Sequence, residues 1–161
     1  MKTRIIIPAL CVMIGACLYG TGLSAEEKGI SNSSGQTVYV PAYSSIYHGD
    51  LKWDMELSIT LSIHNIDPGH AIVIEAIDYY TARGELIHRY VKKNRNVTLR
   101  PLETYNLAIK EKDDRGGIGA NFIVRWRARK KVNSPIVETI MIGTKGQQGV
   151  SFTSRGVVVS D

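Results

Sequence analysis

The sequence predicts an all-β fold, an immunoglobulin- or fibronectin type III-like sandwich of two sheets with seven to eight strands. Three observations support this prediction. Apolar and polar residues alternate with a period of two in several short segments, turn-forming residues separate those segments, and no segment has the 3.6-residue periodicity of a capped helix. The same pattern also allows a small β-barrel, which is the alternative.

The clearest alternation lies at residues 57–63, where Leu or Ile occupies every second position and Ser or Thr stands between them. This pattern predicts a strand with one buried face and one solvated face. A turn follows, because Pro68 presets φ and Gly69 accepts positive φ. Further strands are predicted by similar patterns at residues 37–40, 71–80, 85–91, 96–99, 104–110, 121–128 and 136–142.

The predicted strand at 121–128 separates two kinds of side chain. Its apolar face carries Phe122, Val124, Trp126 and Ala128, and the opposite face carries Arg125 and Arg127, followed by Arg129. We therefore expect Trp126 in the core. The arginine row is either a solvated sheet face or a basic stripe for an acidic polysaccharide, anionic headgroups or an acidic protein. Other basic residues would widen such a stripe if the fold brings them near: Lys92, Lys93, Arg95, Lys130 and Lys131.

The first 25 residues are typical of an export signal. A basic start with Lys2 and Arg4 is followed by an uncharged, largely apolar stretch. Two cleavage sites fit: an ordinary one after Ala25, and a lipoprotein box in which Gly15-Ala16 precede Cys17 and the Cys17 thiol would be lipidated. An uncleaved anchor is the third possibility. Removal of 1–25 leaves no cysteine, which excludes disulfides and thiol catalysis.

These signals predict three regions. Residues 1–25 form the signal (1–16 for a lipoprotein), residues 26–36 are polar and predict a flexible linker, and residues 37–161 form one β-sandwich domain. Once the signal is removed, the net charge is small and positive. Charge this close to balance does not favour nucleic acid as a partner. We expect an exported protein, periplasmic or attached to a membrane through a lipid on Cys17.

Motifs that carry chemistry are weak in this chain. His48 with Asp50, and His64 with Asp67 and His70, do not match the spacing of established metal sites, so we predict no metal. The serine at 151 lacks a nucleophile-elbow pattern. The glycine-rich run at 113–119 has neither the lysine of a phosphate loop nor the spacing of a calcium loop. No cofactor and no catalytic residue are predicted.

Two segments, 39–50 and 143–156, are richer in Tyr, His, Gln, Ser and Gly than surface loops require. Tyrosine offers a flat apolar face and a hydroxyl group, which suits a cleft for a sugar or a peptide. Because chain ends often lie close together in compact domains, we expect the two segments to form one patch. The candidate binding residues are Tyr43, Tyr47, His48, Asp50, Gln147, Gln148, Ser151 and Arg155. The expected polar centre of this patch is His48 or Asp50 paired with Arg155.

Three sequence blocks also carry a family resemblance: YVPAYSSIYHGD at 39–50, GGIGANFIVRW at 116–126 and PIVETIMIGTKGQQGVSFTSRG at 135–156. They resemble an uncharacterised family of exported bacterial proteins, classed only as a domain of unknown function. The resemblance covers the whole mature domain and implies a bacterial source and an envelope location. It implies no activity, substrate or catalytic residue.

Taken together, the sequence predicts a non-enzymatic envelope module that binds a protein or an acidic glycan. The alternative is an envelope hydrolase that uses His48, Asp50 and a serine of the last segment. Geometry separates the two, because a hydrolase needs His48 within reach of Ser151 or Ser154 in a concave site.

Overall fold

A computed structural model describes residues 31–50, 53–92, 94–144 and 149–161 of the chain. This part is nearly all β, as predicted: it holds twelve strands and one short 3-10 helix, Asp114–Gly116. That helix is the only one described, and nothing in the described part is a helix long and apolar enough to cross a membrane.

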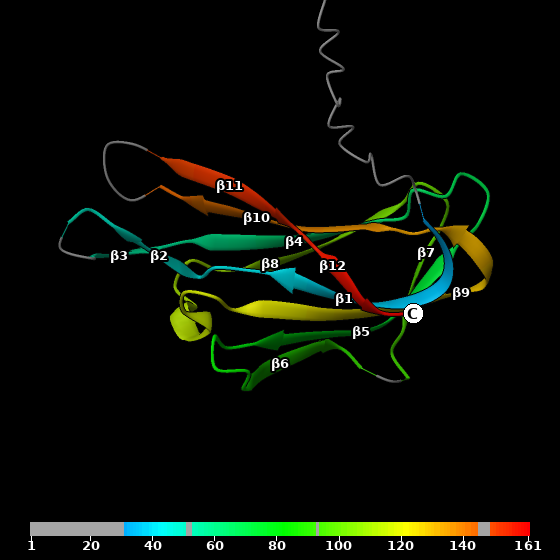
Figure 1. Cartoon of the computed structure of the whole chain (residues 1–161), viewed down its shortest axis with the longest axis horizontal. Coiled ribbons are helices and arrows are strands. Elements are labelled where there is room, and N and C mark those ends of the chain that lie inside the picture. Colours follow the sequence, from blue (N-terminus) through cyan, green and yellow to red (C-terminus); the bar gives the residue numbers. More distant parts are fainter. Residues whose placement is uncertain (1–30, 51–52, 93, 145–148) are drawn as a thin grey trace, which may run out of the picture.

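Two antiparallel sheets form a sandwich-like arrangement, with a small hairpin beside them (Figure 1). The larger sheet has the order β12-β1-β9-β5-β6, and β7 also pairs with β5. Its strands are β1 (Asn32–Pro41), β5 (Ile72–Tyr80), β6 (Leu86–Val91), β7 (Val97–Leu99), β9 (Asn121–Asn133) and β12 (Val157–Ser160). The smaller sheet has the order β11-β10-β4-β8, with β4 (Ser58–His64), β8 (Thr104–Ile109), β10 (Ile136–Gly143) and β11 (Val150–Arg155). The hairpin pairs β2 (Ser45–His48) with β3 (Trp53–Glu56).

The chain passes directly from the small sheet to the large one at Gly156, between β11 and β12. The Gly156 amide donates to the carbonyl oxygen of Val137 at 2.8 Å. A Cβ at this position would lie 2.6 Å from Val38 Cγ1 and 3.0 Å from the Val137 oxygen, so a side chain does not fit. A second link nearby joins the sheets, because the buried Thr139 hydroxyl of β10 donates to the carbonyl oxygen of Pro41 in β1 at 2.6 Å.

One hydrophobic core fills the space between the sheets. Leu57, Ile59, Leu61 and Ile63 are fully buried, which confirms the face predicted by their alternation. Phe122 and Val124 of β9 are fully buried as well, and Trp126 is 2% exposed, so its predicted core position is confirmed.

The strand inventory differs from the prediction at several places. β1 begins at Asn32, so residues 32–36, expected in the linker, are strand paired with β9. The strands β2, β3, β11 and β12 were not predicted, which raises the seven to eight expected strands to twelve in the described part. Much of the two segments at 39–50 and 143–156 is therefore extended and paired. The sandwich-like arrangement is confirmed, whereas an immunoglobulin-like topology is not.

Candidate functional site

The two segments expected to form one patch approach each other at the end of the sandwich where the β2–β3 hairpin projects (Figure 1). The ring of Tyr43, just before β2, lies 5.8 Å from that of Phe152 on β11, centroid to centroid. Tyr43 is half-buried against the core, so its contact with Phe152 is mainly packing. Tyr47 is 60% exposed on β2, and Asp50 is exposed in the turn after it.

The expected polar centre does not form among the described residues. His48 lies at the outer end of β2, where its Nδ1 is 3.2 Å from the carbonyl oxygen of Trp53. Arg155 lies at the other end of β11, opposite Glu138 in the register with β10. No hydrogen bond or ion pair in the described part joins Arg155 to His48 or Asp50, or joins His48 to Ser151 or Ser154. Ser151 lies on the exposed face of β11, opposite Ile142.

Three of the predicted functional residues lie outside the described residues: Gln147, Gln148 and Cys17. The predicted cleavage sites, the lipid anchor and residues 26–30 of the predicted linker also lie outside the described residues.

The arginine row of β9 is partly neutralised by carboxylates of the neighbouring strand β5. Arg127 forms a close ion pair with Glu75, and Arg125 Nη2 lies 3.4 Å from the buried carboxylate of Asp78. Arg89 of β6 approaches the same carboxylate at 3.7 Å. Two of the three arginines of the predicted stripe therefore hold the sheet together, and their charges are largely compensated.

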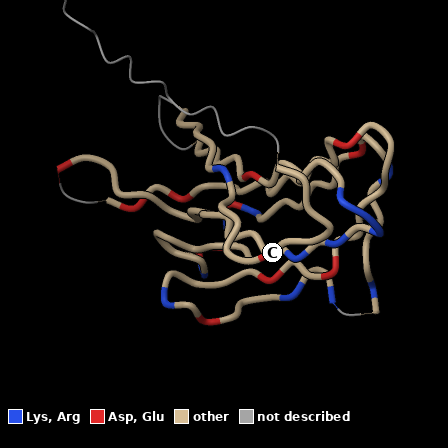
Figure 2. The backbone as a smooth tube through the Cα atoms, turned by 45° about the vertical axis from the view of Figure 1, so that its right-hand side comes forward, with Lys and Arg blue, Asp and Glu red and all other residues tan. Residues whose placement is uncertain are grey.

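Three further basic residues of the predicted stripe lie in a bulge near the end of β9, whereas Lys92 and Arg95 lie between β6 and β7 and Lys93 is outside the described residues. Gly35 of β1 lies opposite Arg127 and Ser33 lies opposite Val132, so Ser34 alone faces the four residues 128–131. These four include Arg129, Lys130 and Lys131, all exposed, and none of the three forms an ion pair with a described residue. Figure 2 shows them as the longest continuous blue stretch of the chain. We call Arg129, Lys130 and Lys131 the basic bulge.

Local contacts on β1 explain how the bulge is accommodated. The Ser33 hydroxyl donates to the carbonyl oxygen of Gly35 at 2.8 Å and accepts from the Gly35 amide at 3.1 Å. A Cβ on Gly35 would lie 3.0 Å from the backbone oxygen of Trp126, so glycine permits the close approach of β1 to β9. This compact turn shortens β1 while β9 arches outward, as expected of a large β-bulge.

A groove of about 510 Å³ lies beside the basic bulge, on the outer side of the large sheet. Its floor includes Val73, Thr98 and Arg127, which stand side by side on β5, β7 and β9 because Val73 pairs with both other residues. Arg129 and Lys130 line one wall, and Gly69, His70 and Ala71 line another. We call this the basic groove.

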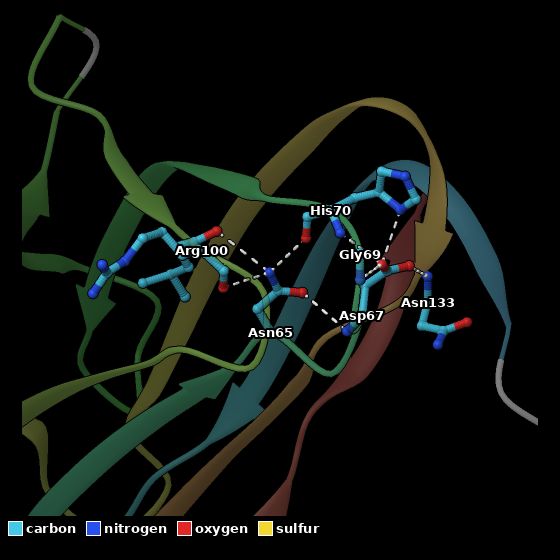
Figure 3. A network of polar contacts seen from close by, with 7 residues as sticks. Asn65, Asp67, Gly69, His70, Arg100 and Asn133 are labelled. Carbon is cyan, nitrogen blue, oxygen red and sulfur yellow. Dashed lines mark hydrogen bonds and ion pairs between the residues drawn. The ribbon is translucent and has the colours of Figure 1, made fainter.

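The wall with His70 is fixed by a polar network centred on Asp67 (Figure 3). Asp67 Oδ1 accepts from the amides of Gly69 and His70 and from the His70 ring, each at 2.9 Å. Its Oδ2 accepts from the amide of Asn133, the last residue of β9, at 3.0 Å. These hydrogen bonds, led by those from Asn133 and Gly69, lower the pKa of Asp67 to about 2.

Asn65 connects this turn to the corner between β7 and β8. Its side-chain amide donates to the carbonyl oxygens of His70 and Arg100 at 2.8 Å, and its Oδ1 accepts from the Asp67 amide. Asp67 and His70, two of the three residues with a possible role at a cation, therefore hold the turn itself. His64 instead contacts Thr104 and Glu138, and no cluster of three metal-ligating side chains exists in the described part.

The sequence patterns predict a tyrosine-rich patch and a possible basic stripe, but they do not predict the basic bulge. A signal for it was present, since three consecutive basic residues interrupt the period-two pattern after Ala128. The acidic partners of Arg125 and Arg127 could not be found in this way, because they belong to a strand about 50 residues away.

A family model described as "Protein of unknown function (DUF3124)" matches residues 35–159. The chain belongs to the DUF3124 family. This confirms the resemblance to a family of unknown function. No curated protein matches the chain. The crystal structure of Thermotoga maritima 1070 is similar over 76% of this chain and 92% of that one, with 10% identity and a TM-score of 0.45, values too low to carry an argument.

Proposed function

We propose that this DUF3124 protein is a non-enzymatic module of the bacterial envelope that binds an acidic glycan in the basic groove. The observation that carries the proposal is the basic bulge: three adjacent cations without a carboxylate partner in the described part, next to a groove of about 510 Å³. Exposed cations that are not neutralised by their own fold attract anionic ligands and speed their association.

The lining of the groove favours a carboxylated sugar chain. Arg129 and Lys130 offer several N–H donors to carboxylates, while Thr98 and His70 add further hydrogen-bonding groups suited to sugar hydroxyls. The exposed apolar surface of Val73 and Ala71 provides a patch against which a sugar ring can pack.

The position of the groove argues against a peptide that binds by strand addition. The groove lies over β5 and β9, and both strands already have neighbours on each side: β9 lies between β1 and β5, and β5 lies between β9 and the pair β6 and β7. Backbone groups of a peptide would therefore find no free strand edge there. A ligand in this groove must therefore be recognised by side chains. A sugar acid is recognised in this way, through hydrogen bonds and ion pairs with side chains.

Titration calorimetry with a hexamer of galacturonic acid, a simple polyuronate, tests this proposal. The purified protein should bind it, and the triple variant Arg129→Ser, Lys130→Ser, Lys131→Ser should bind about tenfold more weakly or worse, because up to three charge contacts are lost. A matched control is Arg83→Ser, Lys110→Ser, Lys112→Ser, which removes three exposed cations from the opposite end of the sandwich. An equal loss of affinity in both triple variants would refute binding in the basic groove. So would an unchanged affinity in the first triple variant.

A further inference from the structure

The last strand, β12, leaves an apolar edge open to solvent. It pairs with β1 on one side and has no strand neighbour on the other within the described part. Its three valines, Val157, Val158 and Val159, are 59%, 45% and 58% exposed. Three consecutive exposed valines on an edge strand form a template for another strand, since unpaired N–H and C=O groups line the same edge.

Natural sheets usually protect such an edge with a charged residue, a proline or a bulge that twists it away. Residues 157–160 contain no charge and no proline. The register of β1 and β12 shifts between Thr37 and Val38: Val38 pairs with Val158 but Thr37 pairs with Ser160, so Val159 is an extra residue of β12. This bulge lies near the end of β12, and Val157 and Val158 keep regular pairing with Tyr39 and Val38. The start of β12 is also held in place by Gly156. A side chain does not fit at this position, and the Gly156 amide donates a hydrogen bond to the carbonyl oxygen of Val137.

The charges at the two ends of β12 select the direction of an added strand. Arg155 lies two residues before the strand, is exposed, and has no ion pair with a described residue. Asp161 directly follows the strand, where its Oδ1 accepts a hydrogen bond from Gln36 Nε2 at 2.9 Å. An antiparallel partner with the same sequence would place its Asp161 near Arg155 and its Arg155 near Asp161. A parallel partner would bring like charges together.

We propose that β12 pairs antiparallel with β12 of a second copy of this chain, so that a two-fold axis joins the two large sheets into one. The interface is isologous, so both copies contribute the same residues. Each valine lies opposite a valine or opposite Ser160 of the other copy, and one Arg155–Asp161 contact lies at each end of the paired strands. Val157 and Val158 also line a groove of about 420 Å³, together with apolar residues such as Val38 and Val137 and polar ones such as Gln36 and Arg155. The basic grooves lie outside this edge and stay accessible in both copies.

Sedimentation velocity over a range of protein concentrations tests the proposal. The wild-type protein should show a monomer–dimer equilibrium, and Val158→Lys should weaken dimerisation at least tenfold, because a charge on the free edge would have to be desolvated. Leu86→Lys is the matched control: it adds the same charge to β6, the opposite edge of the same sheet, at a residue that is 43% exposed. This variant should dimerise like the wild type.

Charge exchange tests the direction of pairing. Arg155→Asp and Asp161→Arg should each weaken dimerisation about fivefold, and the double variant should restore it, because the two opposite charges then face each other again. A wild-type protein that stays monomeric at every concentration up to about 1 mM would overturn the proposal. The proposal would also be overturned if Val158→Lys dimerised as strongly as the wild-type protein. Loss of dimerisation with intact polyuronate binding would leave the proposed function standing, so the two proposals can fail separately.

Discussion

Asp67 and Asn133 join the two walls of the basic groove. The amide of Asn133 at the end of β9 donates to Asp67 Oδ2 in the turn before β5, at 3.0 Å and across 66 residues of sequence. Because the basic bulge occupies residues 129–131, this bond fixes the strand just beyond it. The same carboxylate holds the turn that carries His70. One buried side chain therefore sets how the cations of β9 face the opposite wall.

This arrangement predicts a stability that depends on pH. The pKa of Asp67 falls from 3.8 to about 2 on folding, so its stabilising effect is complete above pH 4 and is lost as the pH falls toward 2. Asp67→Asn should therefore lower the midpoint of thermal unfolding at pH 7 much more than at pH 2. Asp54→Asn, which changes an exposed carboxylate of β3, serves as the control and should have little effect at either pH. Equal destabilisation by Asp67→Asn at both values would be inconsistent with this role.

Replacement of the core tryptophan tests the packing of β9. Trp126 is 2% exposed between the sheets, and its truncation to alanine leaves a large cavity. We expect Trp126→Ala to lower the free energy of unfolding by about 3–5 kcal/mol. Urea denaturation followed by circular dichroism measures this loss. Near-wild-type stability combined with loss of ligand binding would instead place Trp126 in a binding site.

The crossing between the two sheets should be intolerant of any side chain. A Cβ on Gly156 would meet Val38 Cγ1 at 2.6 Å and the Val137 carbonyl oxygen at 3.0 Å. Gly156→Ala should therefore cost about 1–3 kcal/mol, the usual range for overpacking. Gly49→Ala is not an equivalent control, because Gly49 has φ +67. Gly69→Ala is better: its nearest neighbour would lie at 3.7 Å, so a smaller loss is expected there. Comparable losses in both variants would argue against a steric cause at the crossing.

Export of this protein and lipidation of Cys17 both remain predictions from the sequence. If Cys17 is the lipidated residue, growth with a palmitate analogue will label the protein, and Cys17→Ser will abolish the label. A mature N-terminus at Glu26 would instead show cleavage by ordinary signal peptidase and end the lipoprotein hypothesis.

The sequence predicts the central strands well because their burial is one-sided. Alternation at 57–63 and at 121–126 reflects a strand with one face in the core, and the buried residues are the ones expected. The hairpin β2–β3 gives no such signal, because it projects beyond the sandwich and both Tyr47 and Trp53 stay exposed. β12 is missed for a similar reason: its valines are consecutive and exposed, without a polar alternate.

The candidate site is harder to predict than the fold, since it depends on pairings between distant strands. The partners of Arg125 and Arg127 lie on β5, and only the β5–β9 register brings them together. The wall formed by His70 depends on the contact between Asp67 and Asn133. Sequence patterns report which residues face the same side of one strand, but they do not report which strands are neighbours.

The most direct test of the basic groove is a backbone NMR titration of the ¹⁵N-labelled protein with the galacturonic acid hexamer. Binding in the basic groove should shift the amide signals of residues 69–71, 98 and 127–132, and leave those of Tyr43, Tyr47 and His48 unchanged. Shifts confined to the β2–β3 hairpin and β11 would contradict this account and would place the binding surface at the tyrosine-rich end instead.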